Sequence, residues 1–173
     1  MTTAIPDDRR HHSRITFHTT AHLHFGDKQR LGHVDMVRAW RSPGSTLKPF
    51  LYRMAIDDGM IHSESLLIDA PQTFGDYRPG NFGESFNGPI GVAQALRLSL
   101  NVPAVDLLDR VGPQRFAARI DHAGIALKFP QDSKPNLALI LGGTGALRED
   151  LVGTHAAFNR NGISGRVRYT PTD

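Results

Sequence analysis

The sequence predicts an α-rich α/β domain, and three observations carry that prediction. Apolar residues recur at helical spacing in several segments, most of them closed by a glycine, an asparagine or a proline. Between the first two segments runs a stretch dense in Gly, Pro, Asn and aromatic residues, which is typical of an ordered but irregular surface loop. The composition, 39% hydrophobic and 21% charged over 173 residues, is that of one soluble globular domain with a real core.

Charge and composition exclude several classes of function. Twenty Lys and Arg against seventeen Asp and Glu give a net charge of only +3, too weak a balance to favour nucleic acid as a partner. The absence of cysteine excludes disulfides, thiolate nucleophiles and Cys-ligated zinc. Apolar runs such as residues 137–141 are too short to span a membrane, and the N-terminus has no signal-peptide core. We therefore expect the chain, expressed as it stands, to be cytoplasmic.

Residues 1–24 differ from the rest of the chain. Six of the nine histidines precede Val34, and the segment shows no sustained period of 2 or 3.6. His18 and His22 are spaced to share a helix face, yet no carboxylate or cysteine completes a metal-binding set. We predict a polar, disordered tail with at most one short strand, and no metal ion or cofactor.

The helical pattern starts at Ser45 and ends at Gly59, with Pro49 tolerable only in the first turn. This places Ser45 at the mouth of a helix and Lys48 one turn inside it. Residues 61–87 form the predicted loop, whose residues Tyr77, Asn81 and Phe82 we expect to be structural. Helical segments follow at 90–100 (broken at Asn101 and Pro103), 104–112, 113–124 and, after a turn, up to Gly162, and residues 166–172 are predicted to begin a strand.

Ser45 and Lys48 are the first candidates for chemistry. Residues three apart face the same side of a helix, so the Ser45 hydroxyl and the Lys48 amine can approach each other. A serine is a weak nucleophile until a base takes its proton, and lysine serves as that base only when its pKa is lowered. The free N–H groups of a helix N-terminus would also stabilise an oxyanion. By itself, Ser-x-x-Lys is weak evidence of catalysis, because it occurs by chance in many proteins.

A second candidate element is Ser99-Leu100-Asn101, at the break between two predicted helices. Ser99 would relay a proton, and Asn101 would hydrogen-bond both Lys48 and a substrate amide. The competing interpretation is a capping serine and an asparagine that ends a helix.

Longer stretches around both elements resemble a known family. "RSPGSTLKPFLY", "LLIDAPQTFGDYRPGNFGESFNGPIGVAQALRLSLNVPAVDLL" and "PNLALILGGTGALREDLVGTHAAFNRNG" are similar, in order, to the penicillin-binding transpeptidase domain of bifunctional peptidoglycan synthases. The resemblance implies a serine β-lactamase/D,D-transpeptidase-like fold over residues 25–173. It assigns Ser45 as the acylated nucleophile, Lys48 as its activating partner, and Ser99 and Asn101 as the second motif. It also implies that the Ser45 N–H donates to the oxyanion.

The sequence departs from the family pattern in one motif. No Lys-Thr-Gly motif occurs before Asp173, so the second oxyanion donor is missing, a loss worth about 10²–10³ in rate. We also expect the chain to lack the family's glycosyltransferase domain and membrane anchor. We therefore expect a partial domain with an incomplete antiparallel sheet and an uncovered apolar face, derived from a split or frameshifted gene.

Three functional classes follow from the resemblance. The first is acyl-serine transpeptidase chemistry on the D-Ala-D-Ala stem peptides of peptidoglycan, in a family that is inner-membrane anchored and periplasmic, with β-lactams trapped at Ser45. The second is a β-lactamase or β-lactam sensor, for which Glu84 is a candidate deacylation base only because it lies in the loop. The third is a catalytically dead remnant, and we expect this chain to be weakly active or inactive. No substrate-binding residue is assigned.

Overall fold

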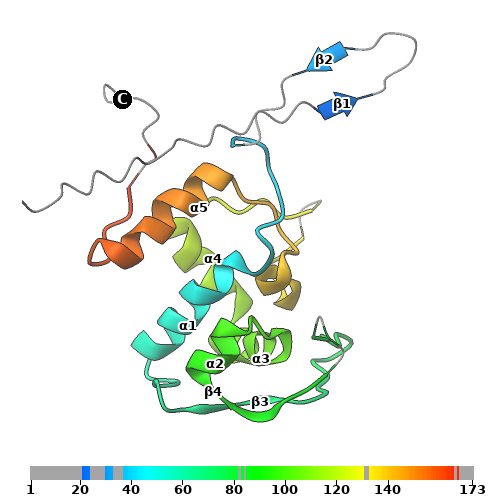
Figure 1. The fold of residues 1–173 in the computed structure, drawn as a ribbon, viewed down its shortest axis with the longest axis vertical. Coiled ribbons are helices and arrows are strands. Elements are labelled where there is room, and N and C mark those ends of the chain that lie inside the picture. The colour runs from blue at the N-terminus through cyan, green and yellow to red at the C-terminus, as the bar shows by residue number, and fades with distance from the viewer. Residues whose placement is uncertain are drawn as a thin grey trace, which may run out of the picture. The chain divides into compact units, whose positions relative to one another are not determined.

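The computed structural model describes residues 21–23, 30–32, 37–81, 83, 85–130, 133–165 and 167 (Figure 1). The chain divides into two compact units, residues 1–35 and 36–173. In the first unit, β1 (Ala21–Leu23) pairs antiparallel with β2 (Arg30–Gly32). The rest of the predicted tail lies outside the described residues, so its disorder and its boundary at residue 24 stay predictions.

The second unit is built mainly of helices, as the sequence predicts. Helix α3 (Asn101–Val111) is its centre, because α1, α4, the short helix η2 and strand β3 all contact it. Most of its side chains are buried, including Val105, Leu107 and Leu108. The surrounding helical elements are η1 (Gly44–Leu47), α1 (Lys48–Asp57), α2 (Val92–Arg97), α4 (Pro113–His122), η2 (Leu137–Leu141), α5 (Arg148–His155) and η3 (Ala156–Asn159).

A hairpin lies within and just after the stretch predicted as an irregular loop. Strand β3 (Leu66–Asp69) pairs antiparallel with β4 (Gly88–Gly91), in the register Leu66 to Gly91 and Asp69 to Gly88. Along β3 the side chains alternate between exposed and buried, as on any half-buried strand. The hairpin packs on α2 and α3 (Figure 1). The prediction of a loop was wrong at residues 66–69, because four residues are too few for a period of two to stand out.

Two helix starts differ from the predictions for the same physical reason. Helix α3 begins at Asn101, not after Pro103, and Pro103 occupies its first turn, where no helical hydrogen bond is lost. Helix α1 begins at Lys48, not one turn earlier, and Ser45 lies on the preceding 3₁₀ turn η1. In both helices, proline marks the first turn and not a break.

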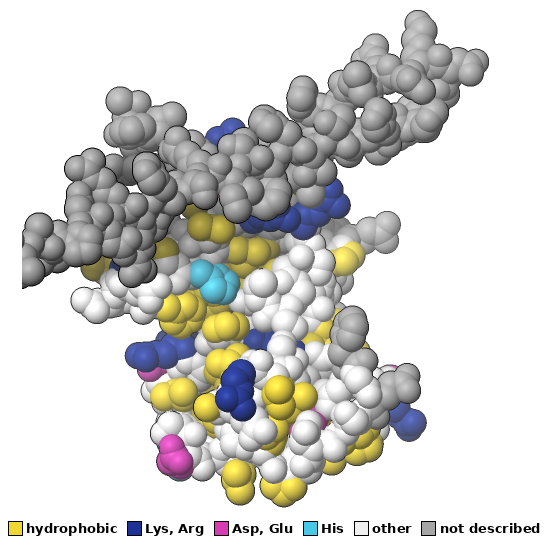
Figure 2. Space-filling view, viewed as in Figure 1, with side chains coloured by type: hydrophobic (Ala, Val, Ile, Leu, Met, Phe, Trp, Pro, Cys, Tyr) yellow, Lys and Arg dark blue, Asp and Glu magenta, His cyan; other side chains and the backbone are white. Residues whose placement is uncertain are grey.

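Aromatic contacts join the start of α1 to the last helices. The Phe50 ring lies 4.6 Å from the His155 ring and 5.1 Å from the Phe158 ring, measured between centroids. Phe158 itself is exposed, as are two other large apolar side chains of this part of the chain, Val152 and Ile163. Figure 2 shows hydrophobic side chains gathered on the face that carries α1 and α5. Within the described residues, no helix combines the length and the apolar character needed to cross a bilayer. Apart from Val167, the strand predicted at 166–172 lies outside them.

Candidate active site

Ser45 lies on a turn that hydrogen bonds hold on both sides. The Thr46 N–H and hydroxyl both donate to the Pro43 carbonyl, at 3.1 and 2.7 Å. The Ser42 hydroxyl donates to the Gly142 carbonyl at 2.8 Å and accepts from the Gly44 N–H at 3.2 Å. These contacts tie η1 to the end of η2 and fix the backbone on which Ser45 is carried.

The Ser45 side chain is exposed, and both its hydroxyl and its backbone N–H are available to a substrate. Its carbonyl accepts the backbone N–H of Lys48, the first residue of α1. Neither its hydroxyl nor its own N–H has a hydrogen-bond partner in the part of the chain that the structure describes. A free N–H at the start of a helix is a suitable donor for a developing oxyanion.

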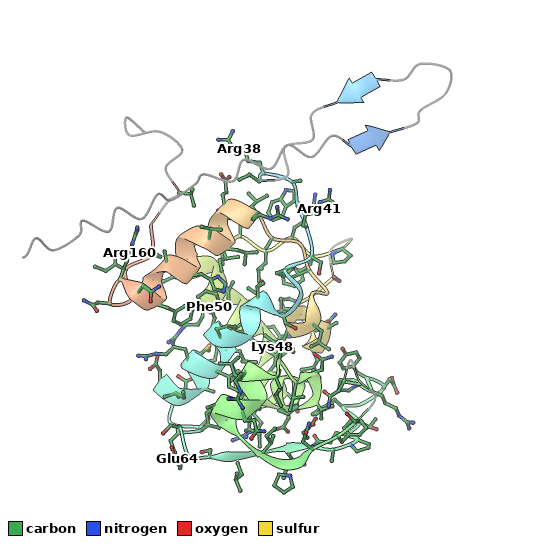
Figure 3. The ribbon with its side chains drawn as sticks, in the orientation of Figure 1. Arg38, Arg41, Lys48, Phe50, Glu64 and Arg160 are labelled. Atoms are coloured by element: carbon green, nitrogen blue, oxygen red, sulfur yellow. The ribbon has the colours of Figure 1, made fainter. Side chains whose placement is uncertain are left out.

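Lys48 is brought into direct contact with the second predicted element. Its side chain is 1% exposed and points from α1 towards the turn between α2 and α3 (Figure 3). The amine donates to the Ser99 carbonyl at 2.6 Å, to Asn101 Oδ1 at 2.8 Å and to Ser99 Oγ at 3.3 Å. Three of the four predicted residues therefore meet. Among the described residues, no hydrogen bond joins the Lys48 amine to the Ser45 hydroxyl.

The surroundings of Lys48 suit a base. Burial lowers the pKa of its ammonium from 10.5 to about 8, with no charged neighbour among the causes. A neutral amine has two hydrogens and one lone pair. The two short hydrogen bonds, to the Ser99 carbonyl and Asn101 Oδ1, use both hydrogens and leave the lone pair for a hydroxyl. Ser99 Oγ, at 3.3 Å, is placed to donate to that lone pair, as a proton relay requires.

Ser99 holds a strained backbone conformation at the site. Its φ is +53°, where glycine is usual, because α2 ends in a Schellman motif with Ser99 at the left-handed position. The Leu100 N–H donates to the Ala95 carbonyl and the Ser99 N–H to the Leu96 carbonyl, both at 3.0 Å. A serine here costs about 1–2 kcal/mol relative to glycine. This strained turn places the Ser99 hydroxyl 3.3 Å from the Lys48 amine.

Asn101 is held in place by Gly80 and Asn81, which lie in the loop that we expected from the sequence to be only structural. Its Nδ2 donates to the Gly80 carbonyl at 2.8 Å, and its backbone N–H donates to Asn81 Oδ1 at 2.9 Å. Its Oδ1 is thus left facing Lys48. In the sequence, the only sign of this contact is a polar Asn among the glycines and aromatics of the loop.

Gly142 shapes the turn that carries Ser45. Its φ is +97°, and a Cβ at this position would collide with Ser42 Oγ and lie 2.9 Å from the Gly44 Cα. We expect Gly142→Ala to destabilise the protein by about 2–5 kcal/mol through overpacking and backbone strain. We also expect it to slow any reaction of Ser45. Chemical denaturation measures the stability, with Gly59→Ala as control, since Gly59 has φ +69° but open space around it. An equal loss in both variants would contradict a special role for the close approach at Gly142.

The described structure offers no second arrangement of this kind outside the Ser45–Lys48 site. A cavity lined by Asp121, Gly124 and Thr154, among others, contains none of the four site residues. No group of three or more His, Cys, Asp or Glu side chains within the described ranges is arranged to hold a metal ion.

Three features of this site are typical of acyl-serine enzymes. They are a buried lysine of lowered pKa, a Ser-x-Asn element that contacts it, and a serine on the turn before the helix. A sequence profile described as penicillin binding protein transpeptidase domain matches residues 28–139. Penicillin-binding protein 1C of Escherichia coli (strain K12) is 53% identical over 147 residues, which are 85% of this chain and 19% of that protein. Penicillin-binding protein 1A of Pseudomonas aeruginosa is 34% identical over 133 residues, 73% of this chain and 16% of that protein. The chain belongs to the penicillin-binding protein transpeptidase family.

Solved structures agree with this assignment. The penicillin-binding protein PonA1 from Mycobacterium tuberculosis superposes with a TM-score of 0.69 at 24% identity, over 80% of this chain and 39% of that one. Its complex with penicillin V gives the same TM-score at 25% identity, over 80% of this chain and 40% of that one. The predicted fold is thereby confirmed. The chain spans less than a fifth of the length of the two curated relatives.

Proposed function

We propose that this chain carries the acylation half of a peptidoglycan transpeptidase site. The Ser45 oxygen attacks the carbonyl between the two D-Ala residues of a stem peptide, and the C–N bond breaks to release D-Ala. The acyl group then passes from Ser45 to an amine of a second peptide. A β-lactam likewise presents an amide to the Ser45 oxygen, and in this case the amide is strained. It acylates Ser45 and stays attached.

The observation that carries this proposal is the environment of Lys48. Its amine is buried, its pKa is lowered to about 8, and its two shortest hydrogen bonds go to Ser99 and Asn101. At pH 7 about a tenth of such lysines are neutral and able to accept a proton. No carboxylate contacts Lys48 in the described part of the chain, so no counter-charge there stabilises its ammonium form.

Each residue has one task in the proposed reaction. Neutral Lys48 takes the Ser45 proton, directly or through the Ser99 hydroxyl, as the serine attacks. The free Ser45 N–H donates to the oxyanion of the tetrahedral intermediate. Lys48 then gives the proton to the departing nitrogen. The absence of a Ser45–Lys48 hydrogen bond in the free protein is compatible with this sequence, because catalytic contacts often tighten only with substrate.

A β-lactamase or sensor shares these opening steps and differs in the lifetime of the adduct. Glu84, the candidate base for deacylation, lies outside the described residues. The lifetime of the penicillin adduct, followed by intact mass after removal of free penicillin, separates the two functions.

Labelling with a fluorescent penicillin tests the proposal. We expect slow covalent labelling of the wild type at Ser45, with the free Ser45 N–H as an oxyanion donor. Ser45→Ala should abolish the label, and Ser63→Ala, which removes an exposed hydroxyl from a turn after α1, should not. Equal labelling of the wild type and Ser45→Ala would contradict the proposal. Absence of label from a cooperatively folded wild type would contradict it as well, and would identify a family member that has lost acylation.

A further inference from the structure

Asp69 is a buried carboxylate that the chemistry described so far does not use. Its side chain is fully buried at the end of β3, where it accepts from Asn81 Nδ2 at 2.6 Å, the Asn87 N–H at 2.9 Å and Asn87 Nδ2 at 2.7 Å. No Lys, Arg or His of the described chain forms an ion pair with it. A charge buried without a counter-ion is costly, and hydrogen bonds alone compensate it here. Such a group is poorly explained as core filling.

Asp69, together with the Ser85 carbonyl, which accepts from Asn81 Nδ2 at 3.1 Å, determines which way the Asn81 carboxamide faces. An ionised carboxylate only accepts hydrogen bonds, so Asn81 must present its Nδ2 to Asp69. Its Oδ1 must then face the opposite direction, where it accepts the Asn101 N–H at 2.9 Å and lies 3.5 Å from the Val102 N–H. These are the first two N–H groups of α3, and α3 has no capping side chain of its own. Asn81 therefore caps the central helix from a distant loop.

The same loop also fixes the side chain of Asn101. Its Nδ2 is held by the Gly80 carbonyl, so its Oδ1 is directed at Lys48 Nζ. We propose that Asp69 and Asn81 are positioning residues that act through Asn101 to hold the Lys48 amine in its reactive orientation. This inference rests on the proposed function. In this arrangement Asp69 on β3 and Asn81 in the following loop fix the first residue of α3, Asn101, and Asn101 in turn fixes the position of the Lys48 amine.

The hydrogen-bond pattern allows a test by exchange of donor and acceptor. In Asp69→Asn, either orientation of the new carboxamide directs its NH₂ at an existing donor, on Asn81 or on Asn87. In Asn81→Asp, two carboxylates face each other. In the double variant, the carboxamide at position 69 donates to the carboxylate at position 81. Its oxygen still accepts from Asn87, and the Asn101 N–H keeps its acceptor. The hydrogen bond between positions 69 and 81 is then restored with donor and acceptor exchanged, and the contact that stays lost is the one from Asn81 Nδ2 to the Ser85 carbonyl, at 3.1 Å.

Two readouts are needed, and one of them is independent of acylation. The Lys48 titration midpoint is measured by NMR on protein carrying ¹³C-labelled lysine, with the exposed Lys128 and Lys134 as internal controls. The rate of acylation by benzylpenicillin is measured well below the melting temperature. We expect both single variants to raise the Lys48 midpoint, as water reaches the amine, and to slow acylation by about 10-fold or more. We expect the double variant to recover the rate to within about threefold, since the geometry that both single variants disturb is restored.

The outcomes separate this inference from the proposed function. Lower melting temperatures with an unchanged Lys48 midpoint and rate would show a merely structural role and overturn it. A midpoint that moves in the single variants and returns in the double variant supports positioning, even if the wild type takes no penicillin and the proposed function fails. Should a single variant not fold, the double variant decides: a folded protein with a midpoint near that of the wild type supports the relay, and an unfolded one overturns it.

Discussion

Replacing Lys48 with methionine should lower the rate of acylation by penicillin about 10²–10⁴-fold, the range expected for loss of a general base. At that rate, we expect no detectable penicillin adduct on the Lys48→Met protein after an incubation of hours. Methionine keeps most of the buried volume but cannot accept the Ser45 proton. It also leaves the Ser99 carbonyl and Asn101 Oδ1 without a donor, which should cost about 1–3 kcal/mol of stability. The measurement is intact mass against time, with a thermal melt on the same sample.

The matched control for this variant is Lys134→Met. Lys134 is exposed and makes no hydrogen bond or ion pair within the described structure, so its loss should change neither the rate nor the melt. A Lys48→Met protein that folds and is acylated at the wild-type rate would remove lysine from the mechanism.

Asn101→Asp should move the pH dependence of acylation upward. In the wild type the rate is expected to rise about tenfold per pH unit below 8 and to level off above it, because neutral Lys48 is the base and its pKa is about 8. A carboxylate in place of the amide oxygen, 2.8 Å from Nζ, stabilises the ammonium and should raise the pKa of Lys48 by about 1–3 units. At pH 7 the rate should fall about 10–10³-fold, with recovery in more alkaline solution.

The shape of this profile separates an electrostatic effect from a folding defect. Loss of the Asn101 Nδ2 donor to Gly80 costs some stability at every pH, whereas the rate deficit should shrink as pH rises. Asn159→Asp, at an exposed position, should leave the profile unchanged. A rate reduced by the same factor at pH 7 and at pH 10 would contradict the role given to Lys48.

The sequence contained the chemistry of the site because both motifs are local. Ser45 and Lys48 share one turn, Ser99 and Asn101 share another, and the stretches around them are long enough to identify the family. The contact between Lys48 and the second motif joins residues 51 and 53 positions apart, yet the known association of the two motifs predicted it. What the sequence did not show is that the buried amine donates to acceptors on the α2–α3 turn and makes no hydrogen bond to Ser45 within the described residues.

The supporting structure of the site had no comparable signal. Asp69 and Asn81 meet across 12 residues, and Asn81 meets Asn101 across 20, through a loop with no period. The four-residue strands β3 and β4 are too short to show alternation, and β4 contains two glycines and a proline. The positive φ of Ser99 was equally hidden, since glycine is the residue that usually marks that conformation. These features depend on tertiary packing, which local propensity does not encode.

Mapping of the penicillin adduct tests the central claim most directly. Trypsin cleaves after Arg41 and Arg53 and spares the Lys48–Pro49 bond, so the turn is released as one peptide, Ser42–Arg53. After reaction with benzylpenicillin, our account predicts that this peptide gains the mass of one penicillin and that fragmentation places it on Ser45, not on Ser42 or Thr46. An adduct on any other residue, or a folded protein that gains no mass after prolonged incubation, would contradict the claim that Ser45 is an activated nucleophile.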